Sequence, residues 1–241
     1  MSRTDVLRIL ADRVLSIELD HPVRVGVDGL SAAGKSTLAD ALADTLRAST
    51  AREVIRVGLD HFKRHVDLRT GYPPGSPESY YHEMYDTDAI RSLLLEPLGP
   101  GGARVLRPWR SLSGRQQHSP GGSRRYRTAV MDLRGRTPVD SPERVAPDDA
   151  ILVADGGFLQ KPALAGHWDL RIYVDIDLAD VQRRGADRDQ AWMDSYEQAA
   201  ERYRTYYVPG ERLYLTEVDP AAVADVVVDN RNFAAPRITR R

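Results

Sequence analysis

The chain has 241 residues, of which 41% are hydrophobic and 29% charged, an ordinary composition for one large globular domain with a sizeable core. Positive and negative charges nearly cancel, to a formal net charge of -1, so the charge favours neither nucleic acid nor an anionic membrane as a partner. The absence of cysteine excludes disulfides, thiolate zinc sites and a cysteine nucleophile.

Residues 1–20 predict an N-terminal amphipathic helix. Apolar side chains recur at helical spacing from Val6 to Ile17, but Arg8 and Arg13 interrupt them. This pattern is typical of neither a signal peptide nor a transmembrane span. We therefore expect the protein to lie in the cytoplasm.

A phosphate-binding loop (P-loop) comes next. Residues 23–28 predict a buried strand and residues 37–46 a helix, and the sequence between them contains G-x-x-x-x-G-K-S. In such a loop, glycines let backbone N–H groups turn inward around an anion, and the helix N-terminus adds its dipole. A chance Gly-rich turn is the alternative, which the flanking strand and helix disfavour. The predicted nucleotide-binding residues are Gly29, Ser31, Ala32, Ala33, Gly34, Lys35, Ser36 and Thr37.

Four more apolar runs, at residues 54–59, 151–155, 170–175 and 226–228, alternate with helical segments. Strands separated by helices predict a parallel sheet that is covered on both faces. Together with the P-loop, this predicts an α/β fold of the P-loop NTPase type. We expect a three-layer sandwich with a mostly parallel sheet, in a single domain spanning residues 1–241.

Three acids follow predicted strands. Asp28, Asp60 and Asp155 each stand at or just after the end of such a run. Because ligands of open α/β sheets bind beyond the carboxyl ends of the strands, we expect these carboxylates to converge. The alternative for each one is that Asp simply favours turns.

Residues 63–149 predict an irregular region. It contains the turn-rich run Gly71–Pro77, a group of tyrosines, and many prolines, glycines and arginines from residue 97 onward. Loops of this length are either functional or partly disordered.

The reaction class follows from which motifs accompany the P-loop. The N-K-x-D segment of GTPases and the L-S-G-G-Q segment of transport ATPases are both absent. A small-molecule kinase needs an acid beside the acceptor hydroxyl, a second acid near Mg²⁺, and arginines that neutralise the transferring phosphoryl group. The chain offers all three. A regulatory protein that hydrolyses nucleotide to change conformation is the alternative from another class.

Four segments resemble the uridine kinase group of P-loop kinases, whose superfamily includes phosphoribulokinase and bacterial pantothenate kinases. They are residues 25–37, 58–62, 155–159 and 224–230. The resemblance implies an enzyme that transfers the γ-phosphate of ATP to a hydroxyl group of a small molecule, with Mg²⁺. It implies that Lys35 binds phosphate, that Asp60 is the general base, and that Ser36, Asp60 and Asp155 lie at the magnesium site.

Residues 178–210 are expected to form a lid and the helix after it. Arg183–Asp189 resembles the R-R-x-x-R-D lid of the uridine kinase group, with one extra residue. Arg184 and Arg188, four residues apart, would share a helix face and clamp phosphate oxygens during catalysis. Arg202 and Arg204 are weaker candidates for the same role. The alternative is a solvated, charged helix.

The resemblance ends at the acceptor side. Tyr80–Asp86 lacks the Asp-His-Pro segment of uridine kinases, and Met131–Arg136 lacks the aromatic ring of their base-stacking hairpin. The acceptor therefore stays open between a uridine-type nucleoside and a pantothenate-, sugar- or hydroxy-acid-like metabolite. Arginines between residues 124 and 136 could receive an anionic acceptor. The sequence leaves open whether identical chains associate. The candidate acceptor contacts are Tyr80, Tyr81, His82, Tyr85 and Arg136.

Overall fold

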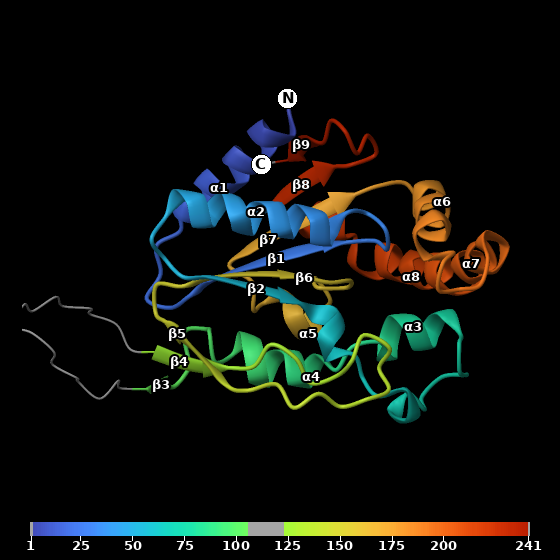
Figure 1. The fold of residues 1–241 in the computed structure, drawn as a ribbon, viewed down its shortest axis with the longest axis horizontal. Helices are drawn as coiled ribbons and strands as arrows, with labels where there is room; N and C mark the ends of the chain where they lie inside the picture. Colours follow the sequence, from blue (N-terminus) through green and yellow to red (C-terminus); the bar gives the residue numbers. More distant parts are fainter. Residues whose placement is uncertain (1, 106–122, 241) are drawn as a thin grey trace, which may run out of the picture.

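A six-stranded sheet lies at the centre of the protein (Figure 1). The computed structural model describes residues 2–105 and 123–240. All neighbouring strands are parallel except the last two, which are antiparallel. The strand order is β2 (Val54–Gly58), β6 (Ile151–Asp155), β1 (Val23–Gly29), β7 (Leu170–Asp175), β8 (Val226–Asp229) and β9 (Arg237–Arg240). Every strand expected from the sequence is present, which confirms the mostly parallel sheet, and β9 is an addition.

Two long helices cover one face of the sheet (Figure 1). The Ser2 hydroxyl accepts the Asp5 N–H at 3.1 Å and caps the first of them. Leu42 and Leu46 of the second are fully buried against the sheet. The helices are α1 (Arg3–Leu15) and α2 (Lys35–Ser49).

Shorter helices cover the opposite face. Alternate residues of β2 and β6 point to this side, where Leu152 packs in one cluster with Ile90 and Leu94. Trp168 lies against Gly26 of β1, so closely that a Cβ at Gly26 would be 2.8 Å from the indole ring. The expected three layers are therefore confirmed. The elements on this face are α4 (Thr87–Ile90), the π-helix η3 (Arg91–Leu95) and α5 (Pro162–Ala165).

The lid and α3 (Pro77–Glu83) face each other beyond the carboxyl ends of the strands (Figure 1). An aromatic cluster joins them, in which Tyr80 and Tyr214 both pack on Phe158 with ring centroids 5.1 Å apart. The lid side consists of α6 (Leu178–Asp189), α7 (Tyr196–Arg202), the π-helix η4 (Tyr203–Tyr207), α8 (Val208–Val218) and α9 (Pro220–Val223).

Residues 63–149 contain more regular structure than the sequence suggested. Besides α3, α4 and η3, they form a small antiparallel sheet, and only residues 127–143 form one long described loop. Residues 106–122 of this region lie outside the described residues. The additional elements of this region are the 3-10 helix η2 (Val66–Leu68) and the strands β3 (Arg104–Val105), β4 (Ser123–Tyr126) and β5 (Arg144–Pro147). The 3-10 helix η1 (Leu59–Phe62) directly precedes the region.

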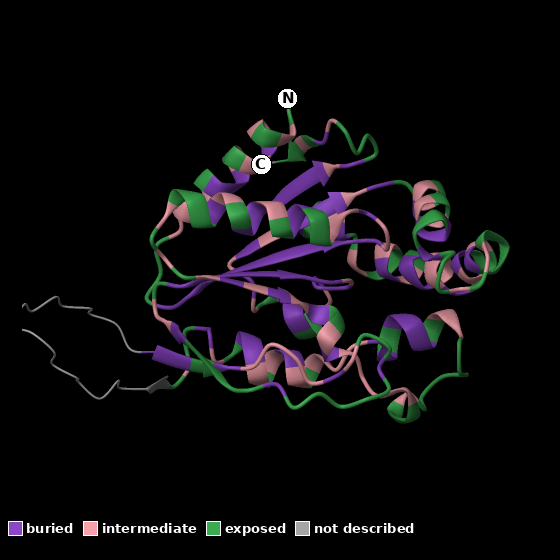
Figure 2. Ribbon diagram, viewed as in Figure 1, coloured by how far each residue is buried: buried purple, intermediate pink, exposed green. Residues whose placement is uncertain are grey.

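Burial follows the layers, since the central strands β1 and β6 are buried along their whole length (Figure 2). Within residues 2–105 and 123–240, no helix combines the length and the apolar character needed to cross a membrane.

Candidate active site

The two glycines of the P-loop have backbone conformations and neighbours that exclude a side chain. At Gly29 the φ angle is 153°, and a Cβ would lie 2.6 Å from the Val174 carbonyl oxygen. At Gly34 the φ angle is 93°, and a Cβ would lie 2.7 Å from Nδ2 of Asn230. That same Nδ2 donates to the Ala33 carbonyl at 2.7 Å, so the end of β8 braces the loop.

Asp155, at the end of β6, is held by residues from two other elements. The Ser36 hydroxyl donates to its Oδ2 at 2.6 Å, and the Arg56 guanidinium contacts its Oδ1 at 2.6 Å. Lys35, next to Ser36, donates to the Leu30 carbonyl at 2.7 Å. The sequence analysis named Ser36 and Asp155 but missed Arg56, because only the pairing of β2 with β6 brings it there.

The Ser36–Asp155 pair fits a magnesium ion bound together with nucleotide phosphates. Mg²⁺ typically takes one or two carboxylates, a hydroxyl, water and phosphate oxygens, rather than a cage of protein side chains. No group of three His, Asp or Glu side chains suited to a metal occurs in the described parts of the chain.

Asp60 is the second residue after β2, in the 3-10 helix η1, and is exposed. The Tyr85 hydroxyl donates to its Oδ1 at 2.8 Å, and Lys63 Nζ lies 3.7 Å from the same oxygen. The Gly157 N–H donates to the Tyr85 oxygen at 3.3 Å. Burial raises the pKa of Tyr85 well above its ordinary value, so its hydroxyl remains a donor.

Asp28, at the end of β1, is buried and accepts hydrogen bonds from three parts of the site. They come from the Gly29 N–H at 2.8 Å, the Gln160 side chain at 3.0 Å and the Tyr214 hydroxyl. Asp28 is therefore buried and fully hydrogen-bonded within the fold, whereas Asp60 is exposed.

Glu211 of α8 is a buried acid beside the P-loop that the sequence analysis did not single out. Its Oε1 accepts the Ser31 N–H at 2.5 Å, whereas its Oε2 is buried without a hydrogen-bond partner. The Tyr80 hydroxyl lies 3.1 Å from the Ser31 hydroxyl. Burial raises the pKa of Glu211 above its ordinary value, and the Ser31 hydrogen bonds offset only part of this rise.

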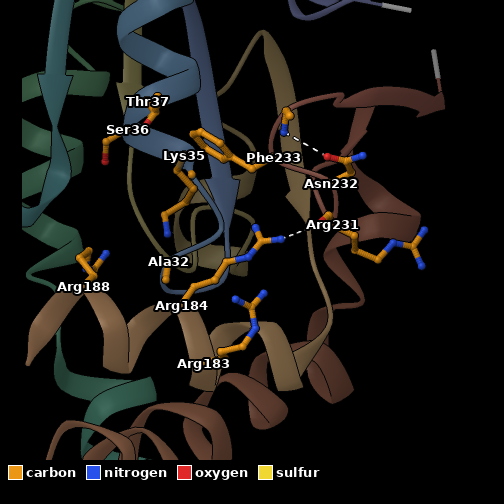
Figure 3. A pocket seen from close by; sticks show the side chains of 12 residues that line it. Ala32, Lys35, Ser36, Thr37, Arg183, Arg184, Arg188, Arg231, Asn232 and Phe233 are labelled. Carbon is orange, nitrogen blue, oxygen red and sulfur yellow. Dashed lines mark hydrogen bonds between the residues drawn. The ribbon is translucent and has the colours of Figure 1, made fainter. Parts of the chain in front are cut away.

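A cavity of about 900 Å³ separates the P-loop from the lid (Figure 3). Both predicted lid arginines line it. Arg184 donates to the backbone oxygens of Asn230, at 3.0 Å, and Arg231, while Arg188 donates to Asp189 at 2.7 Å. The lining residues are Ala32, Gly34, Lys35, Ser36, Thr37, Arg183, Arg184, Arg188, Arg231, Asn232, Phe233 and Ala234.

The loop after β8 is the part of this cavity that the sequence analysis missed. The strand pattern at residues 226–228 could have predicted it, because parallel strands end at the same edge of the sheet. The loop after β8 must therefore lie beside the end of β1. Phe233 presents an exposed ring to the cavity from this loop.

The predicted acceptor contacts lie in different settings. Tyr80 and Tyr81 are buried with their rings packed on Phe158, and the Tyr81 hydroxyl donates to Glu217. His82 is exposed and stacks on Tyr72, and Arg136 is exposed on the 131–136 turn. Of this set, Tyr85 is the residue that hydrogen-bonds a predicted catalytic acid.

Arg124, one of the arginines considered for an anionic acceptor, is fully buried. It donates to the Asp148 carboxylate at 2.6 Å and to the Gly99 carbonyl, so its charge and hydrogen bonds are used within the fold.

No protein-family model matches the chain, and no curated protein sequence matches it. Solved structures do. One is described as a possible uridine kinase from Bacillus stearothermophilus, with 20% identity and a TM-score of 0.61, covering 93% of this chain and 97% of that one. Another is provisionally described as a fructose transport system kinase from Silicibacter sp., with 20% identity and a TM-score of 0.60, covering 88% and 95%. A third is D-glycerate 3-kinase from Cryptococcus neoformans, with 12% identity and a TM-score of 0.61, covering 96% and 98%.

Proposed function

Because the chain has the fold of the uridine kinase-like P-loop kinases, we propose that it transfers the γ-phosphate of ATP to a hydroxyl group of a small molecule. One observation carries the proposal. The Ser36–Asp155 pair and the Asp60–Tyr85 pair both lie where the neighbouring strands β6 and β2 end, beside the P-loop. Groups suited to the phosphate donor and to the acceptor hydroxyl are therefore at the same edge of the sheet.

The donor half consists of the P-loop and the lid. The loop amides and Lys35 would bind the β- and γ-phosphates, and Arg184 and Arg188 would turn from their present partners to the phosphate oxygens. Ser36 and Asp155 would hold Mg²⁺, whose positive charge neutralises the transferring group.

The acceptor half centres on Asp60. Tyr85 and Lys63 both approach its Oδ1, and within the described residues its Oδ2 makes no hydrogen bond. That oxygen would take the proton of the acceptor hydroxyl while the hydroxyl oxygen bonds to the γ-phosphorus and the bond to ADP breaks. Tyr85 would keep the carboxylate in position for this transfer.

Two classes of acceptor are compatible with this site. Resemblance favours a uridine-type nucleoside, but the 131–136 turn offers no ring for a base, and a sugar, pantothenate-like or hydroxy-acid acceptor fits the same machinery. The structural neighbours are described as a possible uridine kinase, a fructose transport system kinase and a D-glycerate 3-kinase, so they leave this choice open.

The test is ADP release from ATP and Mg²⁺ across uridine, cytidine, fructose, pantothenate and glycerate. We expect Lys35→Ala to abolish acceptor-dependent release. Asp60→Asn should lower it by about 10²- to 10⁴-fold, the typical contribution of a general base, while ATP binding is retained. Asp44→Asn, at an exposed position of α2, is the matched control and should keep the wild-type rate.

Two outcomes would count against the proposal. Acceptor-independent ADP release that a partner protein stimulates would favour a nucleotide-driven regulatory protein. A normal rate in Asp60→Asn would refute the assignment of Asp60 as the base.

A further inference from the structure

Two arginines on the acceptor side, Arg64 and Arg69, form no ion pair with any acid among the described residues. Arg69 donates from Nε at 3.0 Å and from Nη2 at 2.7 Å, both times to the backbone oxygen of Arg64. In the described parts of the chain, neither Arg64 nor Arg69 has a carboxylate oxygen within 4.0 Å, and the Arg64 guanidinium makes no hydrogen bond. Arginines elsewhere around the site differ, since Arg56 contacts Asp155 and Arg188 contacts Asp189.

Arg69 is partly buried, so its charge is less well solvated than that of an exposed arginine. Its side chain is half-buried, and burial lowers the pKa of its guanidinium, with the Arg64 charge acting in the same direction. The charge of Glu83 also acts on Arg69, but the two side chains form no ion pair: Oε1 of Glu83 accepts the Gly71 N–H at 2.7 Å, and its Oε2 is buried without a hydrogen-bond partner. A partly buried cation without an ion-pair partner is a group that an anionic ligand stabilises.

The segment that carries both arginines pairs with the segment that carries Tyr85, the hydrogen-bond partner of the predicted base. The Arg64 N–H donates to the Met84 carbonyl, and Lys63 pairs with Tyr85, whose hydroxyl holds Asp60. The Arg69 charge interacts with Tyr85 and with Tyr206 of the lid-side helix η4. In Figure 1 this segment is the short teal helix below α3, at the end of the molecule where the lid stands.

The 131–136 turn closes the outer side of this cluster. The Val66 N–H donates to the Gly135 carbonyl at 2.8 Å, and a Cβ at Gly135 would lie 2.7 Å from Nη2 of Arg69. The turn that carries a base-stacking ring in uridine kinases is thus packed here against an arginine.

We infer that the phosphate acceptor is a hydroxylated anion, and that Arg69 and Arg64 bind its carboxylate or phosphate group while its hydroxyl faces Asp60. This inference rests on the proposed kinase function. The guanidinium groups have N–H donors left over for a bidentate contact, which suits planar carboxylates and phosphates. A neutral nucleoside or sugar would leave both charges without a partner.

The first experiment compares matched acceptors with the wild-type protein. Neutral glycerol is compared with glycerate and with glycerol 3-phosphate, and neutral panthenol is compared with pantothenate. The comparison shows whether a carboxylate or a phosphate group on the acceptor is preferred. We expect kcat/KM for ADP release to be at least about 100-fold higher for one anionic member than for its neutral partner, as two charge-assisted hydrogen bonds allow.

The second experiment uses variants of the arginines. Arg69→Gln should raise the acceptor KM by about 10- to 100-fold and leave the KM for ATP within about twofold, as expected for loss of a charge-assisted contact made to the acceptor alone. Arg69→Lys should recover part of the loss, and Arg64→Gln, whose side chain makes no described hydrogen bond, should give a weaker effect of the same kind. Arg47→Gln on α2 is the control, expected to match the wild type.

The outcomes separate this inference from the kinase proposal. Efficient phosphorylation of uridine, fructose or another neutral acceptor would overturn the anionic acceptor while the kinase stands. An equal effect of Arg69→Gln on anionic and neutral acceptors would overturn the role of Arg69. If no acceptor stimulates ADP release, both proposals fail.

Discussion

Asp155 illustrates how single residues define this site, because each of its carboxylate oxygens has its own partner. Ser36 fixes one oxygen from the P-loop, and Arg56 fixes the other from β2. Arg56 also contacts Asp40 of α2, so it joins the strand and the helix on either side of the acid. The contacts with Ser36 and Arg56 therefore determine where the Asp155 carboxylate lies.

Glu211 gives a pH prediction at the same scale. Its pKa is raised in the folded protein, so the folded state holds this proton more tightly than the unfolded chain. The wild type should then lose stability relative to Glu211→Gln as pH rises from about 4.5 through the raised pKa. Denaturant unfolding of both proteins between pH 4.5 and 8 measures the difference.

Glu78→Gln, at an exposed position of α3, controls for the change in net charge. Its free energy of unfolding should follow that of the wild type across this range. A constant difference between wild type and Glu211→Gln would contradict the prediction.

At the scale of elements, the lid helix α6 is fixed by close packing at its centre. A Cβ at Gly185 would lie 2.1 Å from Cζ of Tyr203, so α6 approaches η4 as closely as glycine permits. This crossing determines which face of α6 is turned to the P-loop, and Arg184 lies on that face.

Arg184→Ala should lower kcat/KM by about 10³-fold or more, since an arginine that neutralises the transferring phosphoryl group contributes 10³- to 10⁵-fold in phosphoryl transfer. Arg212→Ala is the matched control on α8, where Arg212 is exposed and is not among the residues that line the cavity. Steady-state ADP release with the best acceptor measures both. Equal rates in the two variants would show that Arg184 has no part in the reaction.

The elements that the sequence predicted correctly are those with a local signal. The P-loop, its strand and helix, and the acids at strand ends follow from short patterns around Lys35, Asp60 and Asp155. Arg56 and Glu211 reach the site only through strand pairing and helix packing, since Ser31 and Glu211 are 180 positions apart. No pattern around either residue marks it.

The acceptor region was harder to predict for a related reason. Proline and glycine in residues 63–149 indicate turns, but the antiparallel pairing of β4 with β5 depends on residues about 20 positions apart. The tyrosines of α3 carried no indication of whether they face a ligand or the core, and Tyr80 and Tyr81 pack in the core.

At the scale of the whole molecule, the site is assembled from five separate segments at one edge of the sheet. These are the P-loop, the end of β2, the end of β6, the lid and the loop after β8. A ligand that binds across them binds only the folded chain, so it must stabilise the fold.

Saturating ATP with Mg²⁺ should therefore raise the melting temperature. At 100 times Kd the linkage contributes about 2.7 kcal/mol, which corresponds to about 5–10 °C for a chain of this size. A thermal scan with and without nucleotide measures the shift, which EDTA should reduce. Lys35→Ala should lose most of it, and an unchanged melting temperature in the wild type would argue against nucleotide binding.

The buried carboxylate of Asp28 has a consequence for how the molecule opens. Its donors belong to three segments: the start of the P-loop, the segment after Asp155 and the helix α8. Detachment of any one of these segments removes at least one hydrogen bond from the buried carboxylate, so they should open together rather than one by one. In amide hydrogen exchange, the protons of Gly29 and Leu159, which both donate to Asp28, would then share one opening free energy. The P-loop, the segment after Asp155 and α8 would thus behave as a single cooperative unit.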